Sequence, residues 1–300
     1  MKDLFRRAPK RFTAARIENQ AIPDNMWVKC PSCGDLIYTR QFSDNLKVCK
    51  CGYHMRLTAR EWLGLLDDGS FVEFDAALAS VDALGFVSPR HVYEQKLSES
   101  RQQTGLNDAL ITGSGAIDGM PLCLAVTEFE FIGGSMGSAY GERLARVIEH
   151  AADARLPLVT INASGGARQE EGTLALLQMA KVNMALTRLA AAGQPHIALL
   201  VDPCYGGVLA SYTSVADVII AEPGARVGFA GRRVIEQTIR QKLPVHFQTA
   251  EFLLDHGMID MVTPRSELRG VLSTLLRLYR DAFAHTSAAQ HVPALTHVRG

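Results

Sequence analysis

The chain has 300 residues, 47% of them hydrophobic, and its 31 Lys and Arg residues balance 31 Asp and Glu residues, so the formal net charge is zero. This composition is typical of a globular protein with a substantial core, and the balanced charge excludes a strong electrostatic case for nucleic acid or membrane as the main partner. No apolar run is long enough to span a bilayer, and the basic segment 1–25 lacks the apolar stretch of a secretory signal. We therefore expect a cytoplasmic protein with reduced thiols.

Four of the six cysteines fall within residues 26–56, as a Cys-x-x-Cys pair followed by a Cys-x-Cys pair. Two thiolate pairs at this separation are typical of a zinc ribbon. The predicted metal ligands are Cys30, Cys33, Cys49 and Cys51. Because the second pair is tighter than usual, three outcomes stay open: zinc held by all four thiolates, zinc held with His54 in place of one, or loss of the metal. We favour zinc and expect His54 to be a packing histidine.

A larger α/β domain is expected over residues 57–285, beginning with two helices and a pair of strands. Thr58 to Leu66 predicts a short helix with a threonine cap, whereas 87–105 predicts a polar linker containing a solvated helix. Two apolar runs, 109–117 and 122–131, predict paired strands joined by an Asp-Gly turn.

The middle of this domain repeats one pattern, a buried strand followed by a glycine-rich turn and a helix. The turns contain Gly133-Gly134-Ser135, Ser164-Gly165-Gly166 and Cys204-Tyr205-Gly206-Gly207. Strands are expected at 158–161, 196–201 and 217–221, and helices at 140–154, around 174–181, and at 208–213. Turns after parallel strands emerge at one edge of a sheet, so the amides of the last two glycine pairs are expected to converge. Two such N–H donors form an oxyanion hole.

Side chains near these turns offer little for catalysis. The sequence contains no phosphate-binding loop, dinucleotide fingerprint or nucleophile elbow. We interpret Ser164 as a turn residue and His150 and His196 as structural histidines, and a nucleophilic Cys204 would require a lowered pKa. The groups suited to chemistry are therefore backbone amides, which favour a reaction through an enolate or tetrahedral oxyanion.

Arg168, directly after the second turn, has two interpretations. Its guanidinium could bind an anion, such as a phosphate of a carrier, or form an ion pair with Glu170 or Glu171 in the first turn of the next helix. Farther along, helices are expected at 249–256 and 268–283, and a disordered polar tail at 286–300.

Several longer stretches carry a more specific signal than any glycine pair. They are NLKVCKCGYHMRLTAR, GGSMGS, ASGGARQEEG with LLQMAK, GFAGRRVIEQT, KLP and EFLLDHGMIDM, and they run from the ribbon to about Asp281. With them the chain resembles the β subunits of bacterial acetyl-CoA carboxylase carboxyltransferase. The resemblance implies a crotonase-like (ClpP/crotonase) fold of repeated ββα units with a small N-terminal zinc ribbon.

The resemblance also implies an activity, transfer of a carboxyl group from carboxybiotin on a carrier protein to acetyl-CoA, which forms malonyl-CoA for fatty acid synthesis. The implied partners are a carboxyltransferase α subunit in an α2β2 heterotetramer, the biotin carboxyl carrier protein and biotin carboxylase, in an ATP-dependent, nucleotide-binding complex. No side-chain base is required, because the biotin ureido group takes the methyl proton. The implied oxyanion-binding amides are those of Gly165, Gly166, Gly206 and Gly207, and the implied substrate-binding residues are Gly133, Gly134, Ser135 and Arg168.

Three departures from the family pattern bear on the site. The second cysteine pair is Cys-Lys-Cys where the family usually has Cys-Pro-Lys-Cys, Cys204-Tyr205 replaces a threonine-rich stretch, and Arg232 stands where proline usually follows Gly-Phe-Ala-Gly. The first concerns the metal geometry, and the other two concern the wall of the active site.

Two alternatives are also considered. A hydratase or isomerase of the same fold needs a carboxylate acid or base, for which Glu170 or Glu171 is the candidate. The ribbon could instead bind nucleic acid, although we favour a solvated surface for it in a chain of zero net charge. The basic residues that allow this role are Lys29, Arg40, Lys47, Lys50, Arg56 and Arg60.

Overall fold

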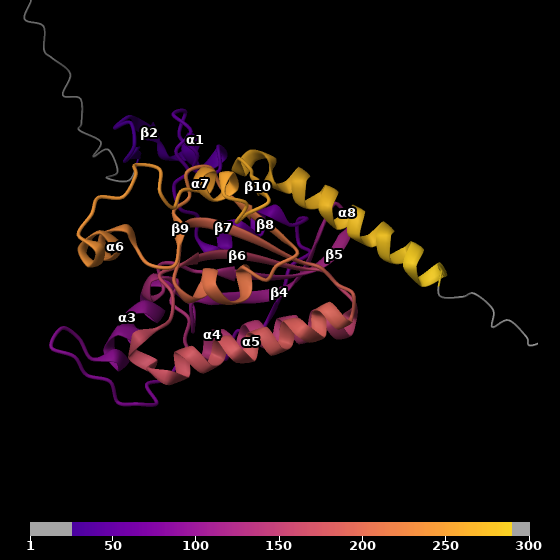
Figure 1. The fold of residues 1–300 in the computed structure, drawn as a ribbon, viewed down its shortest axis with the longest axis horizontal. Coiled ribbons are helices and arrows are strands. Elements are labelled where there is room, and N and C mark those ends of the chain that lie inside the picture. Colours follow the sequence, from indigo (N-terminus) through magenta and orange to yellow (C-terminus); the bar gives the residue numbers. More distant parts are fainter. Residues whose placement is uncertain (1–25, 290–300) are drawn as a thin grey trace, which may run out of the picture.

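The computed structural model describes residues 26–289, with side chains as far as Asp281. The expected basic segment 1–25 and residues 290–300 of the expected tail lie outside the described residues. Figure 1 shows a central sheet with helices on both faces and the small cysteine-rich ribbon at one corner. None of the described helices combines the length and apolar character that a membrane crossing requires.

The core is an eight-stranded mixed sheet with strand order β10-β8-β7-β6-β5-β4-β3, in which β9 pairs with β7. The consecutive neighbours from β5 to β10 in this order are parallel, whereas β3, β4 and β5 are antiparallel. The strands are β3 (Val72–Phe74), β4 (Leu110–Ile117), β5 (Met120–Thr127), β6 (Leu158–Ser164), β7 (His196–Tyr205), β8 (Val218–Ala221), β9 (Val227–Gly228) and β10 (Met261–Val262). Every residue of β6 is buried, as expected for a parallel strand covered on both faces.

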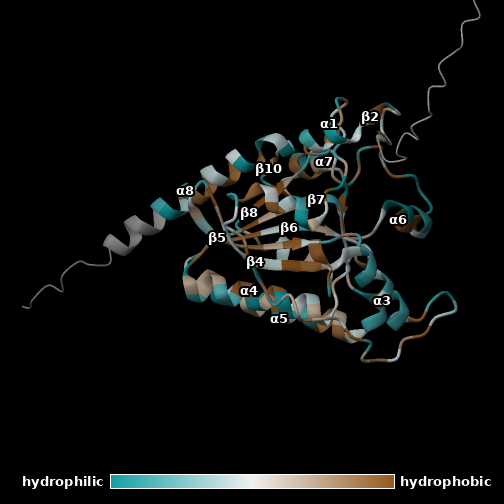
Figure 2. Cartoon of the chain, turned by 180° about the vertical axis from the view of Figure 1, so that it is seen from behind, coloured by the Kyte–Doolittle hydropathy of each residue, from teal (hydrophilic) through white to brown (hydrophobic). Residues whose placement is uncertain are grey.

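Two layers of helices cover the sheet (Figure 1). One face carries α4 (Ser138–Ala154) and α5 (Thr173–Ala191), which pack together. The other carries α8 (Arg265–Ala289), which packs against β4 and β5, and α7 (Ala250–Asp255) lies near its start. Figure 2 shows hydrophobic residues concentrated on the strands between these layers. The predicted α/β class is confirmed.

The ribbon packs onto this body through Arg265 at the start of α8. Its guanidinium pairs with buried Glu222 at 2.6 Å and donates to the carbonyls of Leu46 and Met55 at 2.6 and 2.9 Å. The ribbon contains β1 (Trp27–Lys29), β2 (Leu36–Tyr38) and α1 (Thr39–Asp44), and it is followed by α2 (Ala59–Trp62) and η1 (Leu63–Leu65). The predicted threonine cap is confirmed, because Thr58 and Glu61 form a reciprocal capping box.

Several predicted elements differ from the structure. Helix α3 (Tyr93–Thr104) is not a solvated helix, because the side chains of Tyr93 and Leu97 are fully buried. The expected tail begins too early, because α8 continues to Ala289.

The elements around the second and third glycine turns also differ. Glu170 and Glu171 belong to a separate 3-10 turn, η3 (Gln169–Glu171), because Gly172 at φ +52° interrupts the chain before α5. Strand β7 runs beyond Val201 because β9 pairs with its last two residues. The helix expected at 208–213 is a short π-helical turn, η4 (Leu209–Thr213).

Candidate active site and metal centre

The four cysteine sulfur atoms of the ribbon are placed to share one metal ion. All lie within 4.8 Å of one another, and the pairs Cys30–Cys51 and Cys33–Cys49 are 3.8 and 3.7 Å apart. Four sulfur ligands about 2.3 Å from a tetrahedral zinc ion require a mutual spacing of about 3.8 Å, so the thiols fit zinc. The backbone N–H of Cys33 lowers the pKa of the Cys30 thiol to about 7, whereas the pKa values of Cys33 and Cys49 are raised by burial and by their thiol neighbours. Metal binding would therefore release protons from these two thiols.

The short Cys-x-Cys pair does not disturb this geometry, because its two sulfurs approach different members of the first pair. His54 is engaged elsewhere. Its Nδ1 donates to the Gly52 carbonyl at 2.9 Å, and its Nε2 accepts from the backbone N–H of Arg265 at 3.2 Å. The prediction of a packing histidine is therefore confirmed, and the four cysteines suffice without it.

The three glycine turns lie at the carboxyl ends of β5, β6 and β7, which are neighbours in the sheet. The first turn, η2 (Ile132–Gly134), is joined to the second by the Gly165 N–H, which donates to the Gly133 carbonyl at 2.9 Å. The second and third turns touch, since a Cβ on Gly206 would lie 3.1 Å from the Cα of Gly166. Both of these glycines have positive φ, so a side chain there would be strained as well as crowded. The predicted meeting of the turns is confirmed.

Three of the four amides expected to face a ligand already donate within the protein. Gly165 N–H bonds the Gly133 carbonyl, Gly166 N–H bonds Ser164 Oγ at 3.0 Å, and Gly206 N–H bonds the carbonyls of Gly228 and Phe229. Among the described residues, no acceptor is recorded for Gly207 N–H. The tight packing of the turns explains the difference, because amides buried between two backbones need partners of their own.

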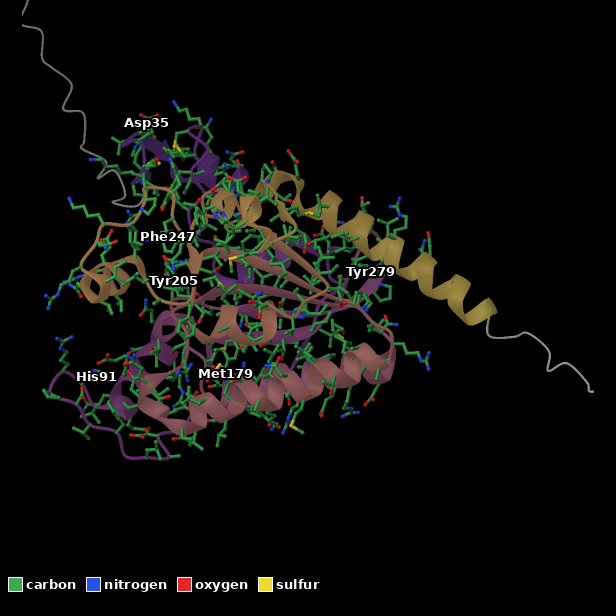
Figure 3. The ribbon with its side chains drawn as sticks, viewed as in Figure 1. Asp35, His91, Met179, Tyr205, Phe247 and Tyr279 are labelled. Atoms are coloured by element: carbon green, nitrogen blue, oxygen red, sulfur yellow. The ribbon has the colours of Figure 1, made fainter. Side chains whose placement is uncertain are left out.

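Two methionines enclose Gly207, and both lie in stretches quoted above for the resemblance, GGSMGS and LLQMAK, although neither has a predicted role. A Cβ on Gly207 would lie 2.6 Å from Met179 Sδ on α5 and 2.9 Å from Met136 Cε. Figure 3 labels Met179 between the sheet and the layer of α4 and α5, and Tyr205 at the edge of the sheet. A separate cavity of about 500 Å³ lies between the ribbon and the sheet, with Tyr53, Asp202 and Arg226 among its lining residues. Both methionines could have been found from their positions, because Met136 follows the first glycine turn directly and Met179 lies on the helix after the second.

Comparisons with known proteins agree with this geometry. Residues 55–253 match the family model of the carboxyl transferase domain, and 27–51 match the acetyl-CoA carboxylase zinc finger domain. The chain is 98% identical, over all of both chains, to "acetyl-coenzyme A carboxylase carboxyl transferase subunit beta 1" of Roseiflexus sp. (strain RS-1). It is 61% identical, over 98% of this chain and 99% of the other, to the corresponding β subunit of Herpetosiphon aurantiacus. The chain belongs to the acetyl-CoA carboxylase carboxyl transferase β subunit family.

Solved structures extend the likeness to the fold. A transcarboxylase 12S structure with methylmalonyl-coenzyme A bound is 28% identical with a TM-score of 0.62, and the match covers 74% of this chain and 41% of that one. The Pseudomonas malonate decarboxylase MdcD–MdcE heterodimer is 25% identical with a TM-score of 0.57, covering 75% of this chain and 86% of the other. The crotonase-like fold expected for a carboxyl transferase β subunit is thereby confirmed. A nucleotide-binding role for the chain itself gains no support.

The position of Arg168 in this β subunit corrects its predicted role in anion binding. The side chain is fully buried, and its guanidinium lies 3.1 Å from Asp108 and 3.3 Å from Glu171. The same group donates to the Ser135 carbonyl at 2.6 Å, and its Nε donates to Ser135 Oγ at 3.1 Å. Burial opposes the charge, but Asp108 and Tyr93 outweigh it and raise the pKa of Arg168. The ion-pair interpretation is thus confirmed for Glu171, and the guanidinium ties the first two turns together.

The remaining substrate-binding candidates also have structural partners. The Gly133 and Gly134 carbonyls accept from the Gly165 N–H and from Ser164 Oγ, respectively. Ser135 is held by Arg168. Each of these groups is therefore already engaged in shaping the first turn.

The other side chains considered for chemistry are inert in this setting. Burial raises the pKa of the Cys204 thiol to about 12, so it is not an activated nucleophile. Burial lowers the pKa of His196 to about 3, which keeps the ring neutral and confirms a structural histidine. Arg232, which departs from the family pattern, bonds Glu236 at 3.1 Å and the Val245 carbonyl, and so fastens α6 (Arg232–Ile239) to the loop after it.

Proposed function

We propose that this chain, with a carboxyltransferase α subunit, transfers a carboxyl group from carboxybiotin on a carrier protein to acetyl-CoA and so forms malonyl-CoA. The observation that carries the proposal is the contact between two glycine turns at the edge of the parallel strands, beside the Gly207 N–H that lacks an acceptor among the described residues. A backbone amide in that position can stabilise the negative oxygen of a thioester enolate.

The residues around Gly207 suit this step. The bare backbones of Gly166 and Gly206 let the two turns meet beside Gly207, and Met136 and Met179 supply an apolar wall. Carboxybiotin, when bound, would supply CO₂ by cleavage of its N–carboxyl bond, and the ureido nitrogen freed by that cleavage would take the methyl proton of acetyl-CoA. The Gly207 N–H would hold the enolate oxygen while the enolate carbon attacks CO₂ and forms the new carbon–carbon bond. The chain needs no charged base for this sequence.

The wider assembly is also part of the proposal. The family works within a multisubunit acetyl-CoA carboxylase, and we propose an α2β2 heterotetramer that receives biotin on the carrier protein and acts beside biotin carboxylase. A cytoplasmic location fits a metal ribbon built from reduced thiols.

A hydratase or isomerase activity is less well supported by the geometry. Both candidate carboxylates are buried and engaged: Glu170 pairs with Lys96, and Glu171 accepts from Tyr93 at 2.7 Å and pairs with Arg168. Burial alone would raise the pKa of Glu170, but Lys96 lowers it, which opposes a role as general acid at neutral pH. The nucleic-acid alternative for the ribbon is weakened in the same way, because Lys47, Lys50 and Arg56 pair with carboxylates.

Co-expression with the α subunit tests the proposal. The purified complex is expected to convert acetyl-CoA to malonyl-CoA with free carboxybiotin, whereas the β chain alone is expected to be inactive. Hydration or isomerisation of an enoyl-CoA by the β chain alone, with no malonyl-CoA from the complex, would contradict it.

A further inference from the structure

A chain of hydrogen bonds between buried side chains runs through the core beneath the three glycine turns. It begins at Thr127 Oγ1, which is 2.8 Å from Tyr140 OH, and continues to Tyr212 OH at 2.9 Å. Tyr212 OH donates to Asn162 Oδ1 at 2.8 Å. The chain then passes from Asn162 Nδ2 to Thr160 Oγ1 at 3.0 Å and on to His196 Nε2 at 2.9 Å.

The direction of the bonds between Thr127 and Tyr212 follows from the donor at Tyr212. Because Tyr212 gives its proton to Asn162, it must accept from Tyr140, which in turn accepts from Thr127. Burial raises the pKa of Tyr140 to about 12 and that of Tyr212 well above its usual value, so both hydroxyls stay protonated at neutral pH. This chain of hydrogen bonds is therefore uncharged at neutral pH. It fixes the positions of its side chains relative to one another.

The central three members come from the three units that bear the turns. Tyr140 lies on α4, which follows the first turn, Asn162 lies on β6 just before the second, and Tyr212 lies on η4 just after the third. All three side chains are at most 2% exposed. We call Tyr140, Asn162 and Tyr212 the junction triad.

The junction triad bears most directly on Gly207. Helical backbone begins at Gly207 and continues into η4, and Ser211 Oγ donates back to the Gly207 carbonyl. Tyr212 is the side chain of η4 that reaches both β6 and α4. A π-helical turn is wider and rarer than an α-helical one and often occurs at functional sites, so an anchor at this point has a specific geometry to maintain. The direction of the Gly207 N–H thus depends on where Tyr212 holds η4.

We infer that Tyr212, bonded to Asn162 and Tyr140, is a positioning residue that sets the orientation of the Gly207 amide towards the reacting thioester. The inference rests on the proposed function only for its catalytic consequence. The structural part, the hydrogen bonds by which Tyr212 joins η4 to α4 and β6, stands independently of it.

The test compares Tyr212→Phe with Thr160→Val in the full chain co-purified with its α subunit. Each variant deletes one buried hydroxyl from the same chain of bonds, but only the first removes the hydrogen bonds that join η4 to α4 and β6. Thr160 lies at the far end, where Asn162 keeps its bonds to the carbonyls of Thr160 and Leu199. For Tyr212→Phe we expect kcat for malonyl-CoA formation to fall on the order of 10–100-fold with KM for acetyl-CoA little changed. For Thr160→Val we expect a lower thermal midpoint but a kcat close to that of the unchanged chain.

Hydrogen–deuterium exchange supplies a readout that needs no activity. Peptides spanning residues 206–214 are expected to exchange faster in Tyr212→Phe and not in Thr160→Val. An unchanged kcat and exchange rate in Tyr212→Phe, or an equal loss of kcat in both variants, would overturn the inference. If Tyr212→Phe does not fold, Tyr140→Phe, which retains the Tyr212–Asn162 bond, replaces it. Its kcat must still fall below that of Thr160→Val, and an unchanged kcat would overturn the inference. If the complex that contains the unsubstituted chain forms no malonyl-CoA, only the proposed function is contradicted. The exchange data then decide whether Tyr212 positions η4.

Discussion

Gly207 is the single residue on which the proposed chemistry most depends, and two substitutions separate its amide from its size. Proline removes the N–H, and its fixed φ suits the first helical position that Gly207 occupies. Alanine retains the N–H and adds one carbon towards the ends of Met136 and Met179, which are flexible. We expect kcat of Gly207→Pro to be roughly 10²–10³-fold below that of Gly207→Ala. Steady-state malonyl-CoA formation by the α-containing complex measures this, and equal kcat values would exclude the amide as an oxyanion donor.

Asp108 offers a prediction about stability at the same scale. Its carboxylate is fully buried and compensates the charge of Arg168. Asp108→Asn therefore leaves the buried guanidinium with less negative charge beside it. We expect the free energy of unfolding in urea to fall by about 3–5 kcal/mol. The matched control is Asp153→Asn, which breaks an exposed pair with Arg188 and should cost no more than about 1 kcal/mol. Similar losses in the two variants would show that the buried pair does not hold the turns together.

At the scale of elements, the ribbon should depend on its metal. The segment has little core of its own, and only Cys30, Phe42 and Cys49 are buried among the hydrophobic residues of 26–56. We expect about one zinc ion per chain. Its removal by a chelator should open 26–56 to proteases while the rest of the chain stays resistant.

Two variants identify the zinc ligands. Cys51→Ser should reduce the zinc content measured by metal analysis, whereas His54→Gln should retain it, because both His54 ring nitrogens already have protein partners. Loss of zinc in His54→Gln would show that the histidine contributes a ligand after all.

For the whole molecule, carboxylates with lowered pKa values predict how stability changes with pH. Lys96 lowers the pKa of Glu170, and Lys47 and Thr58 lower that of Glu61, despite partial burial that opposes both shifts. Because the folded-state pKa lies below the unfolded one, each contributes stability that is present above the unfolded pKa of about 4.5 and is lost as pH falls through the folded value. The free energy of unfolding should therefore decline below about pH 5. Glu170→Gln should make that decline shallower. If the free energy of unfolding falls with pH as steeply in this variant as in the unsubstituted chain, Glu170 does not contribute to the decline.

Local pattern was sufficient for much of this protein. The paired cysteines, the Thr58 cap, the β4–β5 hairpin and the alternation of strand, glycine turn and helix all depend on residues close in sequence, where spacing and backbone preference decide the structure. The same logic predicted that the turns after β6 and β7 share an edge, since parallel neighbours end on the same side.

Contacts between distant residues decided the rest. The sequence could not decide whether Arg168 and Glu170 face a ligand or form ion pairs. In the fold, Arg168 pairs with Asp108 and Glu170 pairs with Lys96, both distant in sequence. The sequence could show four glycine amides, but it could not show that Gly165 and Gly206 would bond to carbonyls of distant segments, or that Gly166 would bond to Ser164 within its own turn. Glycine permits a close approach of two backbones, whereas the partner of each N–H is set by what the completed sheet brings within hydrogen-bond distance.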